Sequence, residues 1–355
     1  MGHLKHPSLR KKDVISTMPE EVITNILHCL PLQDAVKTSI LSKDWKLKWT
    51  MITQFVFDKN FYDYLVKTEN KHCYQSIISR LLFLINGAIT KFVLYLPHCN
   101  EVNVKDINCW IVYLSKNGIK EFTFQDMDED ERLKLTSHLF SCRELTHLKL
   151  DNCSLRPTYE FGGFRNLLSL DLSNISFGGS TCKEFLTQSP LLKILKFSFT
   201  NTEKISEEAE NRVLASLPRL TTLDLDEINF RNDAVISCVI ELIHGFPNLD
   251  TLSTKGTYED AVPLPAACSS EVDFSIMGQL QLLKVTLSCI KGLENEISLI
   301  KYLLDCSPLL KKMDICAKSS KEKGPTILMT RKKYDPCTGT SHHRLGTHLI
   351  YSHMH

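Results

Sequence analysis

A short pattern of apolar residues, Leu-x-x-Leu-x-Leu, recurs along most of this 355-residue chain. Its clearest copies begin at Leu145, Leu167 and Leu220. Looser copies, some with isoleucine, phenylalanine or valine in place of leucine, begin at Ile89, Ile119, Leu192, Leu249, Leu282 and Leu310. Successive copies start 22 to 33 residues apart. Because a repeat of this size cannot bury its apolar residues alone, the spacing predicts a stack of repeats.

The segments between the copies predict outer helices. Apolar residues recur every three or four positions over 104–114, ahead of Asn117-Gly118, and over 235–243, ahead of Gly245. Each copy of the pattern instead alternates apolar and polar residues, which is typical of a short strand. We therefore expect an α/β fold, a leucine-rich-repeat solenoid of irregular period with a parallel β-sheet and outer helices.

The stretch from Thr17 to Val36, TMPEEVITNILHCLPLQDAV, predicts two short helices. Thr17 and Glu20 form a capping-box pattern, so the first helix is expected to start near Met18. The residue before a proline is pushed out of the helical region, so this helix is expected to end at Leu30. Its apolar residues fall on one arc of about 140°. They are Val22, Ile23, Ile26, Leu27 and Leu30.

A second helix is expected from Leu32 to about Ile40, and Ser42 is expected to cap a third helix. That third helix would carry Trp45 and Trp49 on one side, either in the unit's own core or in contact with a partner. Three helices within about 35 residues make a unit too small to sustain a core without outside support. The small size of this unit therefore implies that it packs against the surface of a partner.

Residues 18–49, MPEEVITNILHCLPLQDAVKTSILSKDWKLKW, resemble an F-box. The resemblance rests on the Ile-Leu pair, the Leu-Pro step, the Ile-Leu-Ser-Lys-x-Trp run and a final tryptophan, with Met18 where leucine is usual. It implies a three-helix unit that docks on the Skp-type adaptor of a ubiquitin ligase, and through it on cullin and RING subunits. The implied adaptor-binding residues are Met18, Pro19, Ile23, Ile26, Leu27, Leu30, Pro31, Leu32, Val36, Ile40, Leu41, Ser42, Trp45 and Trp49.

Residues 282–315 resemble the FBD motif found near the C-terminus of plant F-box proteins. The segment pairs two strand patterns with a helix between them, and we expect Ile297, Ile300, Leu303 and Leu304 to face inward from that helix. An F-box, repeats and an FBD segment in this order are similar to the plant F-box/FBD/leucine-rich-repeat family. The FBD-type segment is expected to cap the solenoid, whose last repeat would otherwise expose an apolar flank.

These observations divide the chain into five expected parts. Residues 1–12 form a flexible N-terminal tail, 13–55 the F-box and 56–281 the leucine-rich-repeat solenoid. Residues 282–318 form the FBD-type cap, and 319–355 a disordered tail.

Composition and charge narrow the classes of partner. A net charge of +1 and a pI near 7.5 give no electrostatic case for nucleic acid or an anionic membrane, so partners are expected to be proteins. The N-terminus lacks a secretory signal, and the longest apolar run, from Leu81, has about half the ~20 residues that a membrane span needs. We expect a soluble intracellular protein of the nucleus and/or cytoplasm. The thirteen cysteines include no C-x-x-C pair and are interpreted as reduced, mostly as small core residues.

The remaining features do not predict chemistry. The histidines between His342 and His355 lack cysteine or carboxylate partners at ligand spacing, and the basic stretch from Lys311 to Lys333 is interpreted as a solvated surface. The acidic run 126–131 lacks the glycine and glutamate spacing of a calcium loop. No local signature places a nucleophile. We expect no catalytic residues, no cofactor and no metal.

The expected function is therefore recognition without catalysis. The F-box would hold the ligase, and the repeats would bind a protein substrate of unknown identity for ubiquitination. The alternative is an F-box-containing interaction scaffold that acts outside a ligase.

Overall fold

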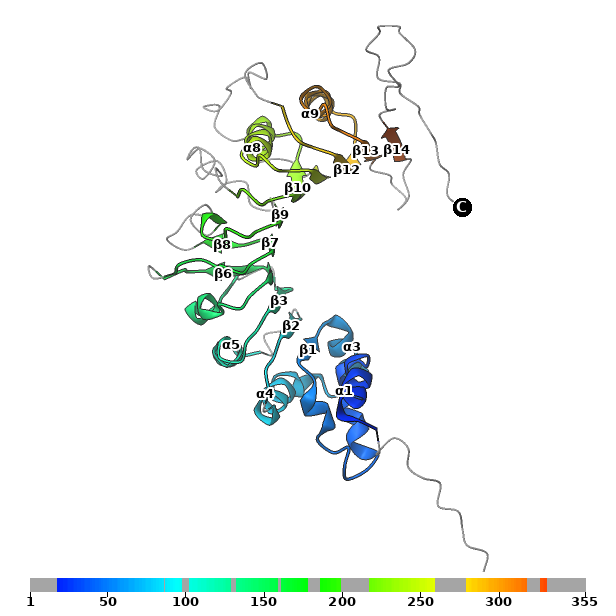
Figure 1. Ribbon diagram of the computed structural model, residues 1–355, viewed down its shortest axis with the longest axis vertical. Coiled ribbons are helices and arrows are strands. Elements are labelled where there is room, and N and C mark those ends of the chain that lie inside the picture. Colours follow the sequence, from blue (N-terminus) through cyan, green and yellow to red (C-terminus); the bar gives the residue numbers. More distant parts are fainter. Residues whose placement is uncertain are drawn as a thin grey trace, which may run out of the picture.

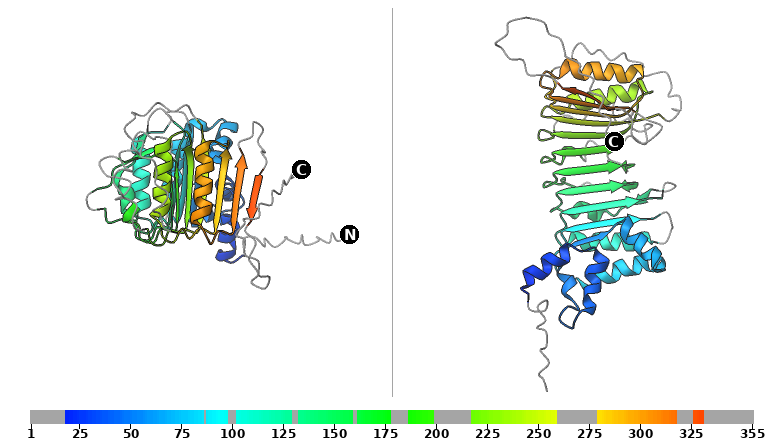
Figure 2. Two further views of the ribbon diagram at one scale, coloured as in Figure 1. Left: turned by 90° about the horizontal axis from the view of Figure 1, so that it is seen from above. Right: turned by 90° about the vertical axis from the view of Figure 1, so that its right-hand side faces the viewer.

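The computed structural model describes residues 18–85, 87–97, 102–128, 132–158, 161–177, 186–198, 217–258, 279–317 and 326–330. They form an elongated, curved array with the N-terminal helices at one end (Figure 1). Figure 2 shows the strands side by side in one continuous sheet.

The main sheet contains eleven strands, and all neighbours except the last pair are parallel. The parallel strands are β1 (Gln54–Phe57), β2 (Lys91–Leu96), β3 (Glu121–Asp126), β5 (His147–Asp151), β7 (Ser169–Ser173), β9 (Ile194–Ser198), β10 (Thr222–Asn229), β11 (Thr251–Thr257), β12 (Lys284–Ile290) and β13 (Lys312–Ala317). β14 (Thr326–Thr330) pairs antiparallel with β13. A second, three-stranded sheet consists of β4 (Leu133–Lys134), β6 (Cys153–Leu155) and β8 (Ser176–Phe177).

The register of the sheet confirms the predicted repeat pattern. Equivalent apolar positions of successive copies lie directly beside one another, as with Leu148, Leu170 and Leu195. These side chains are at most 3% exposed, so each repeat buries its apolar residues against the next. The residues between them point to the concave face.

Helices cover the other, convex face of the sheet, as expected for this architecture (Figure 1). They are α4 (Tyr74–Leu84), α5 (Val104–Ser115), α8 (Asp233–His244) and α9 (Glu294–Cys306), with the short turns η4 (Lys71–Cys73) and η5 (Ser137–Ser141). Ile107, Ile111 and Leu114 of α5 are buried, and Val104 at its start is exposed. Among the residues that the structure describes, no helix is long and apolar enough to cross a bilayer.

The sheet begins one repeat earlier than the sequence pattern indicated. Ile52, Phe55 and Phe57 repeat the apolar spacing, and Phe55 and Phe57 lie in register with Phe92 and Leu94 of β2. The expected boundary after residue 55 therefore falls inside β1. The N-terminal helices lead directly into the first strand without a linker, and α3 (Lys59–Lys67) follows β1.

The C-terminal segment forms the expected strand, helix and strand, with two differences. The buried face of α9 carries Leu299, Tyr302 and Leu303, whereas Ile297 is 44% exposed. Glu296 is buried instead, because its carboxylate accepts backbone hydrogen bonds ahead of the helix. Within 319–355, expected to be disordered, the structure describes 326–330 as strand β14, since the open edge of β13 offers unpaired backbone groups. The histidine-rich end lies outside the described residues.

Candidate partner-binding surface

The first N-terminal helix, α1 (Glu20–His28), divides its apolar residues between the interior and the surface. It starts at Glu20, after Pro19, within two residues of the expected start, and Thr17 lies outside the described residues. Ile23 and Leu27 are at most 3% exposed and pack in the core. The wide apolar arc seen in the sequence is therefore shared between the interior and the surface.

The surface side of α1 carries an apolar stripe. Val22, Ile26 and the following Leu30 are 42%, 41% and 37% exposed, respectively. Residues four apart lie above one another on a helix, so these side chains line up along one side. The chain's own core therefore covers only part of the apolar arc of this nine-residue helix, and the rest of the arc is open to a partner.

The second and third helices are shorter than expected. α2 (Leu32–Lys37) continues into a 3₁₀ turn, η2 (Thr38–Ile40), and the third helix is reduced to the 3₁₀ turn η3 (Lys48–Met51). Ser42 caps neither, since its hydroxyl has no hydrogen-bond partner within the described part of the chain. Trp45 and Trp49 are 3% and 4% exposed, so they belong to the core.

Two polar contacts hold the N-terminal unit together. The Lys48 ammonium lies 2.8 Å from Glu20 Oε1, which ties η3 to the start of α1. This hydrogen bond lowers the pKa of the Glu20 carboxyl. The backbone N–H of Thr53 donates to His28 Nε2 at 3.2 Å, which ties the end of α1 to the start of the sheet.

The fourteen residues predicted to bind the adaptor fall into three groups in the structure. The buried group consists of Ile23, Leu27, Leu32, Trp45 and Trp49. The half-buried group consists of Met18, Val36 and Ser42. The exposed group consists of Pro19, Ile26, Leu30, Pro31, Ile40 and Leu41.

The binding role of these fourteen residues stays a prediction, and the structure shows which of them the chain already buries. The buried group is covered by the chain itself, because the N-terminal helices pack on one another and on β1 in the same core as the repeats. Only the outer residues are open to another molecule.

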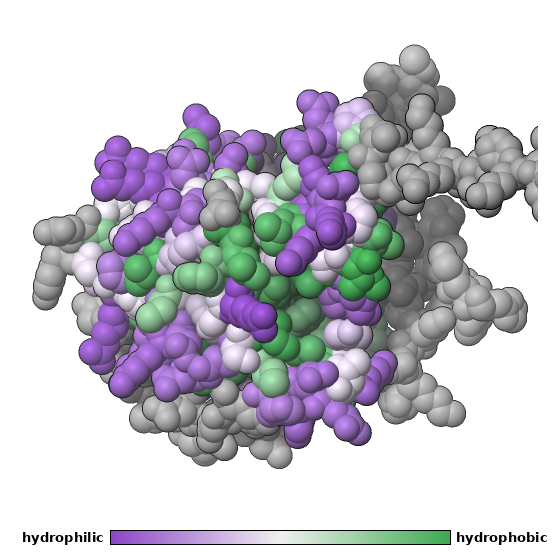
Figure 3. Space-filling model, turned by 90° about the horizontal axis from the view of Figure 1, so that it is seen from below, coloured by the Kyte–Doolittle hydropathy of each residue, from purple (hydrophilic) through white to green (hydrophobic). Residues whose placement is uncertain are grey.

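We use the term apolar surface for Val22, Ile26, Leu30, Ile40, Leu41 and Leu47, which are all more than a third exposed. Figure 3 shows apolar side chains gathered on this end of the molecule within a rim of polar ones. The sequence argument placed Val22 on the apolar arc but left it out of the binding set, and it left out Leu47 as well. Monomeric proteins rarely expose contiguous apolar patches unless they are used in binding.

The concave face of the sheet is the second large surface. Its charged side chains alternate across neighbouring strands and form ion pairs, with nitrogen–oxygen distances of 3.0 Å for Lys91 and Glu121 and 3.3 Å for Lys149 and Asp171. Lys196 and Asp224 form a similar pair. Each pair joins one lysine to one carboxylate, so the paired positions carry no net charge. This pattern could have been found from the sequence by aligning the residues between the apolar positions.

Two carboxylates on the same face differ from these pairs. Partial burial raises the pKa of Asp151 and of Asp226, and the neighbouring Asp171 and Asp224 act in the same direction. The lysines nearby only partly offset this effect. Among the described residues, no group of three His, Cys, Asp or Glu side chains gathers as a metal site would require.

Comparison with known proteins finds two domain families along the chain. Residues 15–53 match the F-box domain family, and residues 86–207 match the family described as "At1g61320/AtMIF1, LRR domain". The chain is 34% identical over 206 residues to the F-box/FBD/LRR-repeat protein At1g13570 of Arabidopsis thaliana, a match that covers 56% of this chain and 47% of the relative.

Two further Arabidopsis thaliana relatives agree. The FBD-associated F-box protein At5g56370 is 28% identical over 51% of this chain and 42% of its own length. The F-box/LRR-repeat protein At3g58940 is 26% identical over 76% of this chain and 50% of its own length. The chain thus spans about half the length of the curated relatives that it matches. The chain thus carries an F-box domain followed by a leucine-rich-repeat domain, and it is similar to Arabidopsis thaliana proteins that are named for an F-box, leucine-rich repeats and an FBD segment.

Proposed function

We propose that this protein is the non-catalytic substrate-recognition adaptor of a Skp–cullin–F-box ubiquitin ligase. The F-box helices dock on the Skp-type adaptor, which connects them to the cullin and RING subunits, and the repeats bind a protein substrate. The F-box match and the curated relatives support the ligase role. The repeat array supports recognition, since stacked repeats provide extended concave binding surfaces.

The apolar surface is the observation that carries the docking proposal. It lies at the end of the molecule, on helices whose other side is already fixed to the first strand (Figures 1 and 3). A partner that covers Val22, Ile26 and Leu30 removes apolar area from water without rearranging the core. Binding there leaves the concave face of the repeats open.

The concave face favours a protein substrate over a polyanion. Its cross-strand pairs are neutral overall, so a nucleic acid would find no basic stripe. Because these Asp and Lys side chains are already paired, they can form specific polar contacts with a substrate without leaving an unpaired charge on the free protein. The proposed mechanism is proximity, in which the bound substrate is held near a charged ubiquitin-conjugating enzyme at raised effective concentration.

The test is reconstitution with purified Skp-type adaptor, cullin and RING subunits. We expect wild-type chain to retain the adaptor in a pull-down and to bring cullin with it. Changing Leu30-Pro31 to Ala-Ala removes an exposed apolar contact and the start of α2, so adaptor retention should fall at least about tenfold. Phe83→Ala is the matched control, because Phe83 is 86% exposed on α4 and lies outside the apolar surface.

Two outcomes would oppose the proposal in different ways. Undiminished adaptor binding by the Leu30-Pro31 variant, with an unchanged thermal melt, would refute the docking assignment. Adaptor binding without any recovery of cullin would favour an F-box-containing scaffold that acts outside a ligase.

A further inference from the structure

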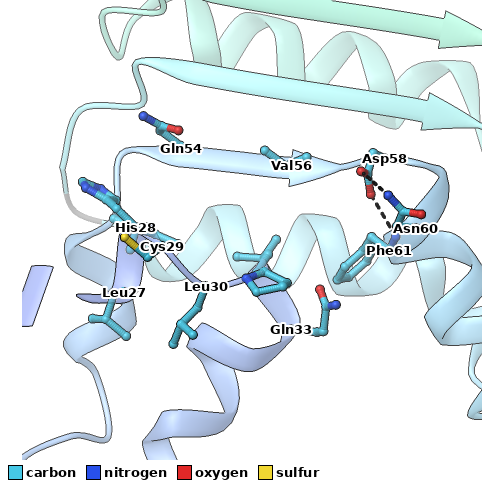
Figure 4. Close-up of a pocket in the computed structure, with 13 residues that line it drawn as sticks. Leu27, His28, Cys29, Leu30, Gln33, Gln54, Val56, Asp58, Asn60 and Phe61 are labelled. Carbon is cyan, nitrogen blue, oxygen red and sulfur yellow. Dashed lines mark hydrogen bonds between the residues drawn. The ribbon is translucent and has the colours of Figure 1, made fainter. Parts of the chain in front are cut away.

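A groove lies between the end of α1 and the first strand of the sheet, with a volume of about 530 Å³. This volume is within the range of sites that bind ligands. Figure 4 shows its walls, with the α1–α2 junction on one side and β1 on the other. The walls include Leu27, His28, Leu30, Pro31, Gln33, Gln54, Val56 and Phe61.

The groove has an apolar floor and an uncharged rim. Leu27, Ile52 and Phe61 are each at most 4% exposed and form the floor, whereas Gln33 and Gln54 lie at its edges. The Asp58 carboxylate, which lines the groove, already accepts hydrogen bonds from within the chain. Asp58 accepts hydrogen bonds from Phe61 N at 2.9 Å and from the Asn60 side chain at 3.1 Å, as the cap of α3. The groove therefore selects an uncharged segment with an apolar residue.

One wall of the groove is an open sheet edge. β1 is the first strand of the main sheet, and within the described part of the chain it pairs on one side only, with β2. The N–H of Lys91 donates to the carbonyl of Thr53 at 3.2 Å. Backbone direction alternates along a strand, so the odd-numbered residues bond to β2, and Gln54 and Val56 direct their N–H and C=O groups away from it. Both residues line the groove.

The N–H of Thr53, just before β1, is already paired, because it donates to His28 Nε2 at 3.2 Å. Within the described part of the chain, no hydrogen bond occupies the backbone groups that Gln54 and Val56 direct into the groove. Unpaired edge groups beside an apolar floor match the requirements of an added strand.

We propose that an extended segment of the Skp-type adaptor occupies this groove and pairs with the open edge of β1. The inference rests on the proposed function. Leu30 belongs both to the apolar surface and to the groove lining, so the two surfaces are continuous. A partner that covers α1 reaches Val56 without crossing a gap. Adaptor binding thus involves the first repeat as well as the F-box helices.

The first test measures the affinity of purified Skp-type adaptor for full-length variants by calorimetry. Val56→Pro removes the outward N–H and fills its place with the proline ring, a change that an edge strand tolerates. We expect about tenfold weaker binding, as for the loss of one or two net hydrogen bonds. Val56→Thr keeps the N–H and the β-branched shape and serves as the control, with affinity expected within about twofold of wild type.

The second test uses wild-type protein, so it does not depend on the folding of a variant. Amide hydrogen exchange of Gln54 and Val56 is measured in the free chain and in the adaptor complex, and we expect exchange to slow in the complex. Equal exchange in both states, or equal affinity for Val56→Pro and wild type, overturns this inference but leaves the docking on α1 intact. Protection that rises with the concentration of free chain also overturns it, because the occupant is then a second copy. Failure of wild type to bind the adaptor at all overturns the proposed function.

Discussion

Thr254 is a polar residue in a column of apolar ones. In the register of the sheet it lies between Leu225 of β10 and Leu287 of β12, and its side chain is fully buried. Within the described part of the chain, its hydroxyl has no hydrogen-bond partner. A buried hydroxyl without a partner costs stability, because it loses its hydrogen bonds to water on folding.

We predict that Thr254→Val raises the free energy of unfolding by about 1 kcal/mol, since valine has the same shape without the hydroxyl. Chemical denaturation checks this value. Thr286→Val is the control, because Thr286 lies on the next strand at a half-buried position on the concave side and should change stability by less than about 0.5 kcal/mol. A decrease in stability for Thr254→Val would show that the hydroxyl is used in the fold.

Among the elements, α9 depends on one buried carboxylate. Glu296 is 1% exposed and accepts hydrogen bonds from the backbone N–H groups of Lys291, Gly292 and Leu293. Tyr258 from the preceding repeat donates its hydroxyl proton to the same carboxylate. Glu296 therefore fixes the turn before α9 and joins the FBD-type segment to the array.

We predict that Glu296→Gln lowers the free energy of unfolding by about 1.5 to 3 kcal/mol, because the amide nitrogen faces N–H donors where a carboxylate oxygen accepted them. Thermal unfolding and the exchange rates of the Gly292 and Leu293 amides measure the effect. Glu294→Gln changes the same charge in the first turn of α9 and should have a much smaller effect. Similar losses for the two variants would mean that charge near the helix end, rather than the buried contacts, stabilises α9.

The elements also show what a sequence pattern can and cannot predict. The apolar arc of α1 was predicted from the sequence, but periodicity does not show which part of the arc faces the core and which part faces the surface. Ile23 and Leu27 turned out to face the chain's own core, and Ile26 the surface. Ile297 was expected to face inward from the apolar spacing of the helix, which does not show that the Glu296 carboxylate is buried by its backbone hydrogen bonds. The expected third helix is only the short turn η3, and Trp45 and Trp49 are buried in the core, which the local sequence pattern left open.

For the whole molecule, the repeat spacing was enough to predict the architecture. A copy of the pattern every 22 to 33 residues leaves few alternatives to a parallel stack, and the register of the strands confirms it. The first strand was missed because it directly follows the F-box helices, so the expected boundary after residue 55 divides its apolar residues between the two parts. The concave ion pairs were not predicted, because pairing depends on the register of the strands, which has to be read from an alignment of the repeats.

Our central claim is that the Skp-type adaptor binds at the apolar surface of the N-terminal helices and the substrate at the concave face of the repeats. The two binding sites would then lie on separate surfaces of one array. The most direct measurement is the dissociation constant of purified Skp-type adaptor for full-length wild type, Ile26→Asp and Lys196→Glu. Ile26→Asp places a carboxylate in the proposed interface, so its affinity should fall by more than about tenfold. Lys196→Glu changes the concave face and should leave adaptor affinity within about twofold of wild type. Unchanged binding by Ile26→Asp, or an equal loss for Lys196→Glu in a folded protein, would contradict the account.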